Sequence, residues 1–180
     1  GEMAGYLFAP AEKVPEELKS RNQWVCWNPR IGKAPLMVNG KGADKTNPEH
    51  WTDFGTCHKS RLGGVGYVFV SDDPFCGIDL DACRDPQTGV LDEWAQNIVL
   101  EIDSYTEVSP SGTGVKIFCR AVNPFESGRN TKLAFEEKFG RRPGIEIYDR
   151  GSYFTVTGAT LPGYEAIRDV DSELLRRIHD

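Results

Sequence analysis

The stretch Phe75-Cys-Gly-Ile-Asp-Leu-Asp81 has the alternating pattern of a β-strand with one buried face. Successive side chains of a strand point to opposite faces, so Asp79 and Asp81 share one face while Ile78 and Leu80 share the other. Two carboxylates about 7 Å apart repel each other unless a cation lies between them, and a hard divalent ion with oxygen ligands suits that position. The pair therefore predicts a metal site. The alternative is a solvated strand edge, where an isolated Asp-x-Asp also occurs.

Two further strands place polar groups on one face. The loop Ser109-Pro-Ser-Gly-Thr-Gly114 leads into Val115-Lys-Ile-Phe-Cys119, which turns Lys116 away from its apolar neighbours. The strand Gly144-Ile-Glu-Ile-Tyr-Asp149 places Glu146 and Tyr148 on one face. Three carboxylates can hold two divalent ions that bridge triphosphate oxygens, and loop amides, a serine hydroxyl and a lysine suit phosphate. Together these strands predict nucleotidyl transfer.

The composition is that of an ordinary globular protein, with 180 residues of which 39% are hydrophobic and 27% charged. This length allows one domain with a sizeable core. The chain has no apolar run near the roughly 20 residues of a membrane span and no signal-peptide pattern, so we expect a cytoplasmic protein without a membrane partner. Five scattered cysteines, none in a Cys-x-x-Cys pair, predict buried free thiols.

The net charge of −6 argues against a protein that coats nucleic acid non-specifically, but it allows a local basic groove. The polar segment 125–142, with a short helix expected around residues 131–139, gathers basic side chains. These are Arg129, Lys132, Lys138, Arg141 and Arg142. The segment is either a substrate-facing arm, which we favour, or solvated surface. Lys33, Lys41 and Lys45 lie in a loop over residues 30–46, where they could attract phosphate or simply be solvated.

The remaining pattern predicts an α+β arrangement. A strand is expected over residues 23–27, with its tryptophans in the core, and a helix from Asn47-Pro48 to about Lys59. Apolar positions at helical spacing from Leu91 to Ile102 predict a helix that packs on the sheet. Short helices are expected after residues 15 and 171. Turn residues predict two hairpins, one joining residues 63–70 to 75–81 and the other joining 144–149 to 153–158.

The three strand motifs, in their order, resemble those of the archaeo-eukaryotic primase superfamily, particularly the primase-polymerase domains of phage and plasmid replication proteins. The resemblance runs from about Gln23 to Gly158. It implies a mixed α/β fold in which an RNA-recognition-motif-like catalytic sheet packs with an N-terminal α/β unit. The expected catalytic domain covers residues 23–165, between an N-terminal extension (1–22) and a C-terminal helix (166–180) that could lead into a downstream domain.

By this resemblance, Asp79, Asp81 and Glu146 are catalytic and bind two Mg²⁺ or Mn²⁺ ions. The implied nucleotide-binding residues are Ser109, Ser111, Gly112, Thr113, Gly114, Lys116 and Tyr148. The implied nucleic-acid-binding residues are Arg129, Lys132, Arg141 and Arg142. The reaction is template-directed addition of dNTPs or NTPs during DNA replication in a bacterial, archaeal or phage-infected cell. Its partners are a DNA template and primer, with a fused or separate helicase and a helical primase domain.

The motifs depart from the family pattern at two positions. Lys116 stands where the second motif usually ends in His, and Glu146 where the third motif is often Asp. A lysine can hold phosphate as a point charge but lacks the directed contact of an imidazole. The departures leave room for a nucleic-acid-binding module that has lost efficient chemistry. A metal-dependent nucleotide-sugar glycosyltransferase also uses Asp-x-Asp, although that function leaves the Ser111 loop and Glu146 unexplained.

Overall fold

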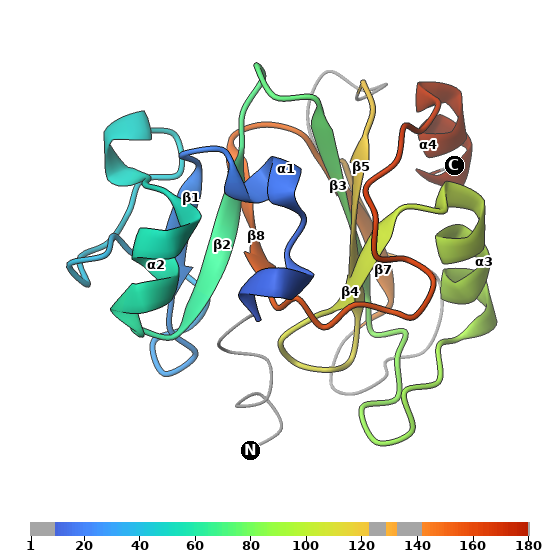
Figure 1. Ribbon diagram of the computed structural model, residues 1–180. Helices are drawn as coiled ribbons and strands as arrows, with labels where there is room; N and C mark the ends of the chain where they lie inside the picture. Colours follow the sequence, from blue (N-terminus) through green and yellow to red (C-terminus); the bar gives the residue numbers. More distant parts are fainter. Residues whose placement is uncertain (1–9, 123–128, 133–141, 180) are drawn as a thin grey trace.

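The computed structural model describes residues 10–122, 129–132 and 142–179. In these residues the chain forms two antiparallel β-sheets and four α-helices, with the sheets side by side (Figure 1). The α+β class expected from the sequence is therefore confirmed. A three-stranded sheet has the order β1-β2-β8, and a five-stranded sheet has the order β4-β5-β3-β7-β6.

The first sheet contains β1 (Trp24–Trp27), β2 (Gly64–Phe69) and β8 (Ser152–Val156), flanked by α1 (Glu16–Lys19) and α2 (Phe54–Ser60). Trp24 and Trp27 are fully buried, as predicted. The single helix predicted from Asn47 to Lys59 is wrong in one respect, because it is two elements. A 3₁₀ turn at Pro48–His50 is capped by Asn47, and α2 begins afresh after Asp53, whose carboxylate accepts a hydrogen bond from Thr56 N at 2.9 Å.

The second sheet has β3 (Phe75–Asp81) at its centre. Its other strands are β4 (Tyr105–Val108), β5 (Val115–Arg120), β6 (Arg129–Lys132) and β7 (Gly144–Tyr148). One face is covered by α3 (Glu93–Ile102) and α4 (Ser172–His179), as Figure 1 shows. Cys76, Ile78 and Leu80 pack there. In the part of the chain that is described, no helix has the length and apolar character needed to cross a membrane.

The opposite face of β3 packs against the first sheet at its start and opens further along. A Cβ atom added to Gly77 would lie 2.5 Å from the Phe154 ring and 2.6 Å from the Phe69 ring, so only glycine allows the two sheets to come this close. Phe118 of β5 joins the same aromatic core, with its ring centroid 5.6 Å from those of Phe69 and Phe154. Two residues beyond Gly77, Asp79 lies on this same face. All five cysteines are buried and free, as predicted.

Both predicted hairpins are wrong. β2 pairs with β1 and β8, while β3 pairs with β5 and β7, so the chain crosses from one sheet to the other at the β2–β3 turn. The β7–β8 turn crosses back in the same way. The first turn is held by a side chain: the Asp73 carboxylate accepts hydrogen bonds from Phe75 N at 2.9 Å and from Val70 N at 3.2 Å. Turn residues indicate where the chain changes direction, but tertiary packing selects the strand partner.

The segment before β7 departs from prediction as well. Thr131 and Lys132 belong to the edge strand β6, which pairs with β7, and not to a helix. Residues 133–139 of that predicted helix lie outside the described residues. The pairing with β7 gives these two residues cross-strand hydrogen-bond partners, which a local propensity estimate does not take into account.

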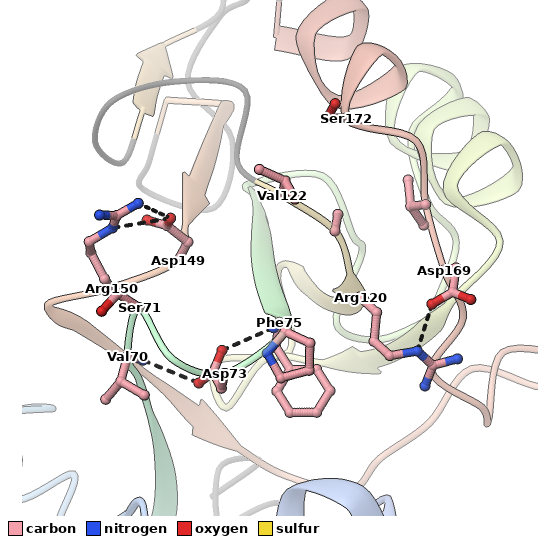
Figure 2. Close-up of a pocket in the computed structure, with 13 residues that line it drawn as sticks. Val70, Ser71, Asp73, Phe75, Arg120, Val122, Asp149, Arg150, Asp169 and Ser172 are labelled. Carbon is pink, nitrogen blue, oxygen red and sulfur yellow. Dashed lines mark hydrogen bonds and ion pairs between the residues drawn. The ribbon is translucent and has the colours of Figure 1, made fainter.

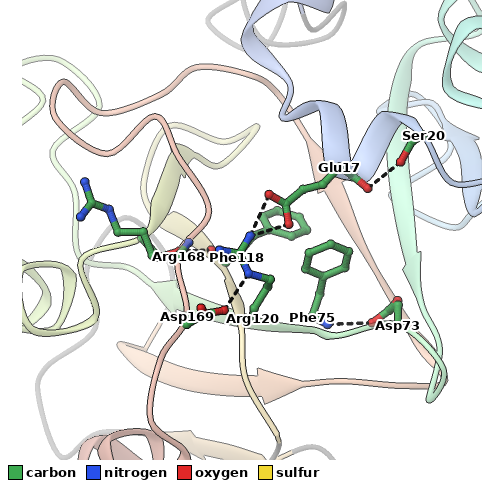
Figure 3. Close-up of polar contacts among 9 residues, drawn as sticks. Glu17, Ser20, Asp73, Phe75, Phe118, Arg120, Arg168 and Asp169 are labelled. Carbon is green, nitrogen blue, oxygen red and sulfur yellow. Dashed lines mark hydrogen bonds and ion pairs between the residues drawn. The ribbon is translucent and has the colours of Figure 1, made fainter.

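Arg120, at the end of β5, joins both ends of the described chain to the second sheet (Figure 3). Its Nη1 atom donates to both carboxylate oxygens of Glu17 in α1, at 2.7 and 2.9 Å. Its Nε atom donates to Asp169 Oδ1 at 2.7 Å. The guanidinium therefore links α1, β5 and the segment that leads into α4, on the side of the sheet where β3 begins.

Candidate active site

Asp79 lies at the centre of a row of charged residues that crosses the second sheet. Its Cα partner is Lys116 on β5 and, on the other side, Glu146 on β7. Lys116 is in turn the partner of Glu107 on β4. Directly paired residues point to the same face. The common face predicted for Asp79, Lys116 and Glu146 is therefore confirmed, and the structure extends the row to Glu107.

The charged row opens into a cleft of about 360 Å³ between the second sheet and β8 of the first sheet. This volume is within the usual range of small-molecule sites. The second sheet contributes Asp79, Lys116, Glu146 and Tyr148 to its lining. The first sheet and its loops contribute Lys33, Lys45, Ser152, Tyr153, Phe154 and Thr155. Four of the predicted site residues thus line one cleft.

The charges around Asp79 oppose one another. Burial raises the pKa of Asp79, and the neighbouring carboxylates of Asp81 and Glu146 raise it further, while Lys116 and Lys33 act to lower it. The Tyr148 hydroxyl donates to the Glu146 carboxylate, and burial raises the pKa of Tyr148, so the phenol remains a donor at neutral pH. Asp79 is therefore a buried carboxylate with two carboxylates and two lysines around it, and burial is the main reason that its pKa is raised.

The donor chemistry of this site fits a divalent cation. Carboxylate oxygens are the preferred ligands of Mg²⁺ and Mn²⁺, and a cation would offset both the burial that raises the pKa of Asp79 and the repulsion from Asp81 and Glu146. Among the described residues, however, no group of three or more His, Cys, Asp or Glu side chains has the geometry to hold a metal ion. Asp81 Oδ1 instead accepts a hydrogen bond from Ala82 N at 3.0 Å. Metal binding would require the carboxylates to converge.

The second motif forms a compact loop held by its own hydroxyl groups. Ser111 Oγ lies 2.8 Å from Thr113 Oγ1 and 3.3 Å from Ser109 Oγ, which also accepts a hydrogen bond from Gly114 N at 3.1 Å. Gly112 has a φ of 81°, the left-handed region that favours glycine. The three hydroxyls of this loop and the Gly114 amide thus already have partners within the loop.

The loop is fixed against the end of β3. Arg84 Nη1 donates to Gly112 O at 2.8 Å. A Cβ atom on Gly114 would lie 2.5 Å from Leu80 O and 3.5 Å from Asp81 Cα, so the loop approaches the strand as closely as glycine allows. Asp81 and Ser109 to Gly114 are not among the described residues that line the cleft. These residues therefore lie outside the lining of the cleft, at the end of β3.

The predicted basic arm is only partly described. Arg129 and Lys132 lie in β6, whose Asn130 is the Cα partner of Glu146. Arg142 is exposed and lies just before β7. Arg141 and Lys138 fall outside the described residues. β6 thus places this segment next to the strand that carries Glu146.

The sequence assigned no role to Glu107, although the structure buries it completely in the charged row. Its carboxylate accepts hydrogen bonds from Tyr105 Oη at 2.7 Å, from Thr157 N at 2.7 Å and from Gly158 N at 3.2 Å. It therefore ties β4 to the segment that follows β8. Tyr105 and Glu107 are two residues apart, so the sequence predicts that they share one face of a strand. This spacing does not reveal that the Glu107 carboxylate is buried.

Another cavity, of about 470 Å³, lies at the opposite end of β3 (Figure 2). Its charged groups are engaged with one another: Arg120 with Asp169, and Arg150 with Asp149 through hydrogen bonds of 3.2 and 3.0 Å. None of the described residues that line it is a predicted site residue. The cleft at Asp79 is therefore the candidate active site.

The fold and the cleft define an α+β protein whose site sets carboxylates and lysines side by side on the open face of an antiparallel sheet. No family model matches the chain. The chain is 36% identical, over 159 residues and 85% of its length, to a DNA primase-polymerase of Nitratiruptor phage NrS-1. It spans 21% of the length of that relative. The chain is thus homologous to about a fifth of this protein, which supports the relationship to primase-polymerases that the motifs imply.

Proposed function

We propose that this chain is the catalytic part of a DNA primase-polymerase of the archaeo-eukaryotic primase superfamily, which adds nucleotides to a primer as a template directs. The observation that carries the proposal is the pairing of Asp79 with both Lys116 and Glu146 at the mouth of one cleft. Similarity to a relative named a DNA primase-polymerase supports it independently.

The three carboxylates of Asp79, Asp81 and Glu146 would hold two Mg²⁺ or Mn²⁺ ions. Such ions, when bound, activate the primer 3′-hydroxyl and stabilise the leaving pyrophosphate. Tyr148 orients Glu146 by donating its hydroxyl to that carboxylate. The two residues lie on the same face of β7, so the tyrosine supports the carboxylate without displacing it from the cleft.

Lys116 would hold a phosphate group of the incoming nucleotide. Its Nζ atom lies 4.6 Å from the centroid of the Phe154 ring, and this cation–π contact limits where the ammonium can point. A lysine remains charged at neutral pH and binds phosphate as a point charge, so it can replace the usual histidine for electrostatic binding. Ser109, Ser111, Gly112, Thr113 and Gly114 would border the phosphates from the loop at the end of β3.

The nucleic acid would lie along the edge of the second sheet that β6 forms. Arg129, Lys132, Arg141 and Arg142 supply positive charge in this segment, and phosphate contacts of this kind position a duplex without reading its sequence. A helicase and a helical primase domain, fused or separate, are proposed partners of this chain.

A nucleic-acid-binding module with weak or lost chemistry is the second candidate. It is favoured by Lys116 in place of histidine and by the absence, among the described residues, of a ready-made metal cluster. The two candidates differ in one property: the enzyme requires the carboxylates and a metal to act, whereas the module binds DNA without either.

Templated incorporation tests the proposed reaction. A labelled primer is annealed to four DNA templates that differ in the first unpaired base, and each dNTP is offered singly with Mg²⁺ or Mn²⁺. We expect incorporation of the complementary nucleotide on each template, and none when EDTA is present or the template is omitted. DNA binding without incorporation would favour the binding module. Turnover of a nucleotide sugar in place of a dNTP would indicate a glycosyltransferase.

A further inference from the structure

The cleft has a second wall, formed by the first sheet, to which the motifs assign no role. Lys33 and Lys45 reach the cleft from the loop after β1, and Thr155 lines it from β8. With Lys116, the lining holds three lysines but only two carboxylates, those of Asp79 and Glu146. The whole chain has a net charge of −6, whereas the lining of the cleft carries more lysines than carboxylates. Such a lining suits an anionic ligand.

Lys33 is positioned by a contact with β8. The Tyr153 hydroxyl donates to the Lys33 carbonyl, which ties the loop to the strand that borders the cleft. The Lys33 side chain is partly buried, and its charge acts on Asp79 from across the cleft. Lys41, in the same loop, is exposed and is not among the residues that line the cleft. The loop therefore presents Lys33 to the site and Lys41 to solvent.

Thr155 is the unusual polar group of this wall. Only 2% of the residue is exposed, and its hydroxyl has no hydrogen-bond partner among the described residues. A buried hydroxyl without a partner is costly, and such groups in native proteins call for an explanation. β8 is the edge strand of its sheet, with β2 as its strand partner on the other side. The Phe154 ring faces the second sheet, so by alternation Thr155 lies on the other face of β8 together with Tyr153, which contacts the Lys33 loop. A ligand bound at this edge of the cleft would supply the missing partner.

We propose that Lys33 and the Thr155 hydroxyl bind the triphosphate of the incoming nucleotide from the wall opposite Lys116. The inference rests on the proposed function and extends it to the first sheet. Phosphate oxygens accept hydrogen bonds from a hydroxyl and attract an ammonium, and charge-assisted contacts of this kind are stronger than neutral ones. The triphosphate would thus extend from Lys116 to the edge of β8, and the first sheet would be part of the active site.

Nucleotide binding in the absence of DNA tests this inference. Affinities for dATP and for dAMP, each with Mg²⁺, are measured by calorimetry for the wild type, Lys33→Met, Thr155→Val and Thr155→Ser. Lys41→Met serves as the control for a lost charge in the same loop. We expect Lys33→Met and Thr155→Val to weaken dATP binding about tenfold or more and to change dAMP binding less. Lys41→Met should bind both as the wild type does, and Thr155→Ser should retain dATP affinity.

Thermal unfolding separates this role from a structural one. Valine has the shape of threonine without its unpaired hydroxyl, so Thr155→Val should keep or raise the melting temperature while nucleotide affinity falls. Wild-type dATP affinity in Lys33→Met and Thr155→Val overturns the inference and leaves the proposed function intact. Loss in only one variant removes the other residue from the site. Equal losses for dATP and dAMP refute contact with the terminal phosphates. A wild type that binds neither nucleotide overturns the proposed function as well.

Discussion

Asp79 of β3 and Lys116 of β5 are direct cross-strand partners, so their side chains share one face at the centre of the second sheet and the ammonium acts electrostatically on the carboxylate. Glu146 is the partner of Asp79 on its other side, and this second carboxylate acts against the ionised form of the first. The paired carboxylates of Asp79 and Glu146 therefore carry one more negative charge than Lys116 alone offsets. An arrangement of this kind favours cation binding at the expense of stability.

Asp79→Asn should stabilise the metal-free protein at pH 7. Burial raises the pKa of Asp79, so the folded state binds this proton more tightly than the unfolded state does. Stability should then fall as the pH rises from the unfolded-state pKa, about 3.9, through the raised folded-state value. Asparagine avoids this loss, and the gain in unfolding free energy should be of the order of 1 kcal/mol at pH 7 and smaller near pH 4.

Urea denaturation at the two pH values, with EDTA present, measures this difference. Asp72→Asn is the matched control, because Asp72 is exposed in the β2–β3 turn and should change stability little. An Asp79→Asn variant that is less stable than the wild type at pH 7 would show that Lys116 and Lys33 stabilise the Asp79 carboxylate by more than the burial of its charge costs.

Gly114→Ala should displace the second-motif loop from β3. The added Cβ atom would meet Leu80 O at 2.5 Å, and because that oxygen is backbone the loop must move. We expect a loss of about 1–3 kcal/mol in unfolding free energy and a clear loss of primer extension. Gly42→Ala is the control, since nothing lies within 4 Å of the added atom. Normal extension by a stable Gly114→Ala variant would contradict a phosphate-binding role for the loop.

Glu107→Ala should destabilise the fold. The substitution leaves Thr157 N, Gly158 N and Tyr105 Oη without their acceptor inside the protein. Buried donors left unpaired cost about 1–3 kcal/mol each, although the site can relax, so we expect a total loss of about 3 kcal/mol. Glu101→Ala, at an exposed position of α3, provides the comparison. A loss below about 1 kcal/mol for Glu107→Ala would mean that water replaces the carboxylate.

Strand faces were predictable from sequence, and strand neighbours were not. A period of two is enough to place Asp79 with Asp81 and Glu146 with Tyr148, and the structure confirms both pairs. Alternation leaves the register open, so the direct pairing of Asp79 with Lys116 became evident only in the folded sheet. The two hairpins failed for a related reason: the turn residues are present, but each turn leads into the other sheet.

The second wall of the cleft was the least predictable part of the site. Threonine is common in β-strands, so a threonine at position 155 does not by itself indicate a site. No local pattern reveals that its hydroxyl is buried without a partner among the described residues. Lys33 could be identified only as one of several loop lysines, because the contact that positions it comes from Tyr153, 120 residues further along the chain. Contacts between residues so far apart in the sequence depend on the packing of the two sheets.

Extension of a labelled primer on a DNA template by the wild type, Asp79→Asn and Asp72→Asn is the most direct test of the central claim. The rates are measured with Mg²⁺ or Mn²⁺ at protein concentrations that saturate the primer-template, with binding checked by fluorescence anisotropy. We predict extension by the wild type and Asp72→Asn, and a rate at least about 100-fold lower for Asp79→Asn despite intact DNA binding. Extension by Asp79→Asn at the wild-type rate would contradict a catalytic role for the cleft.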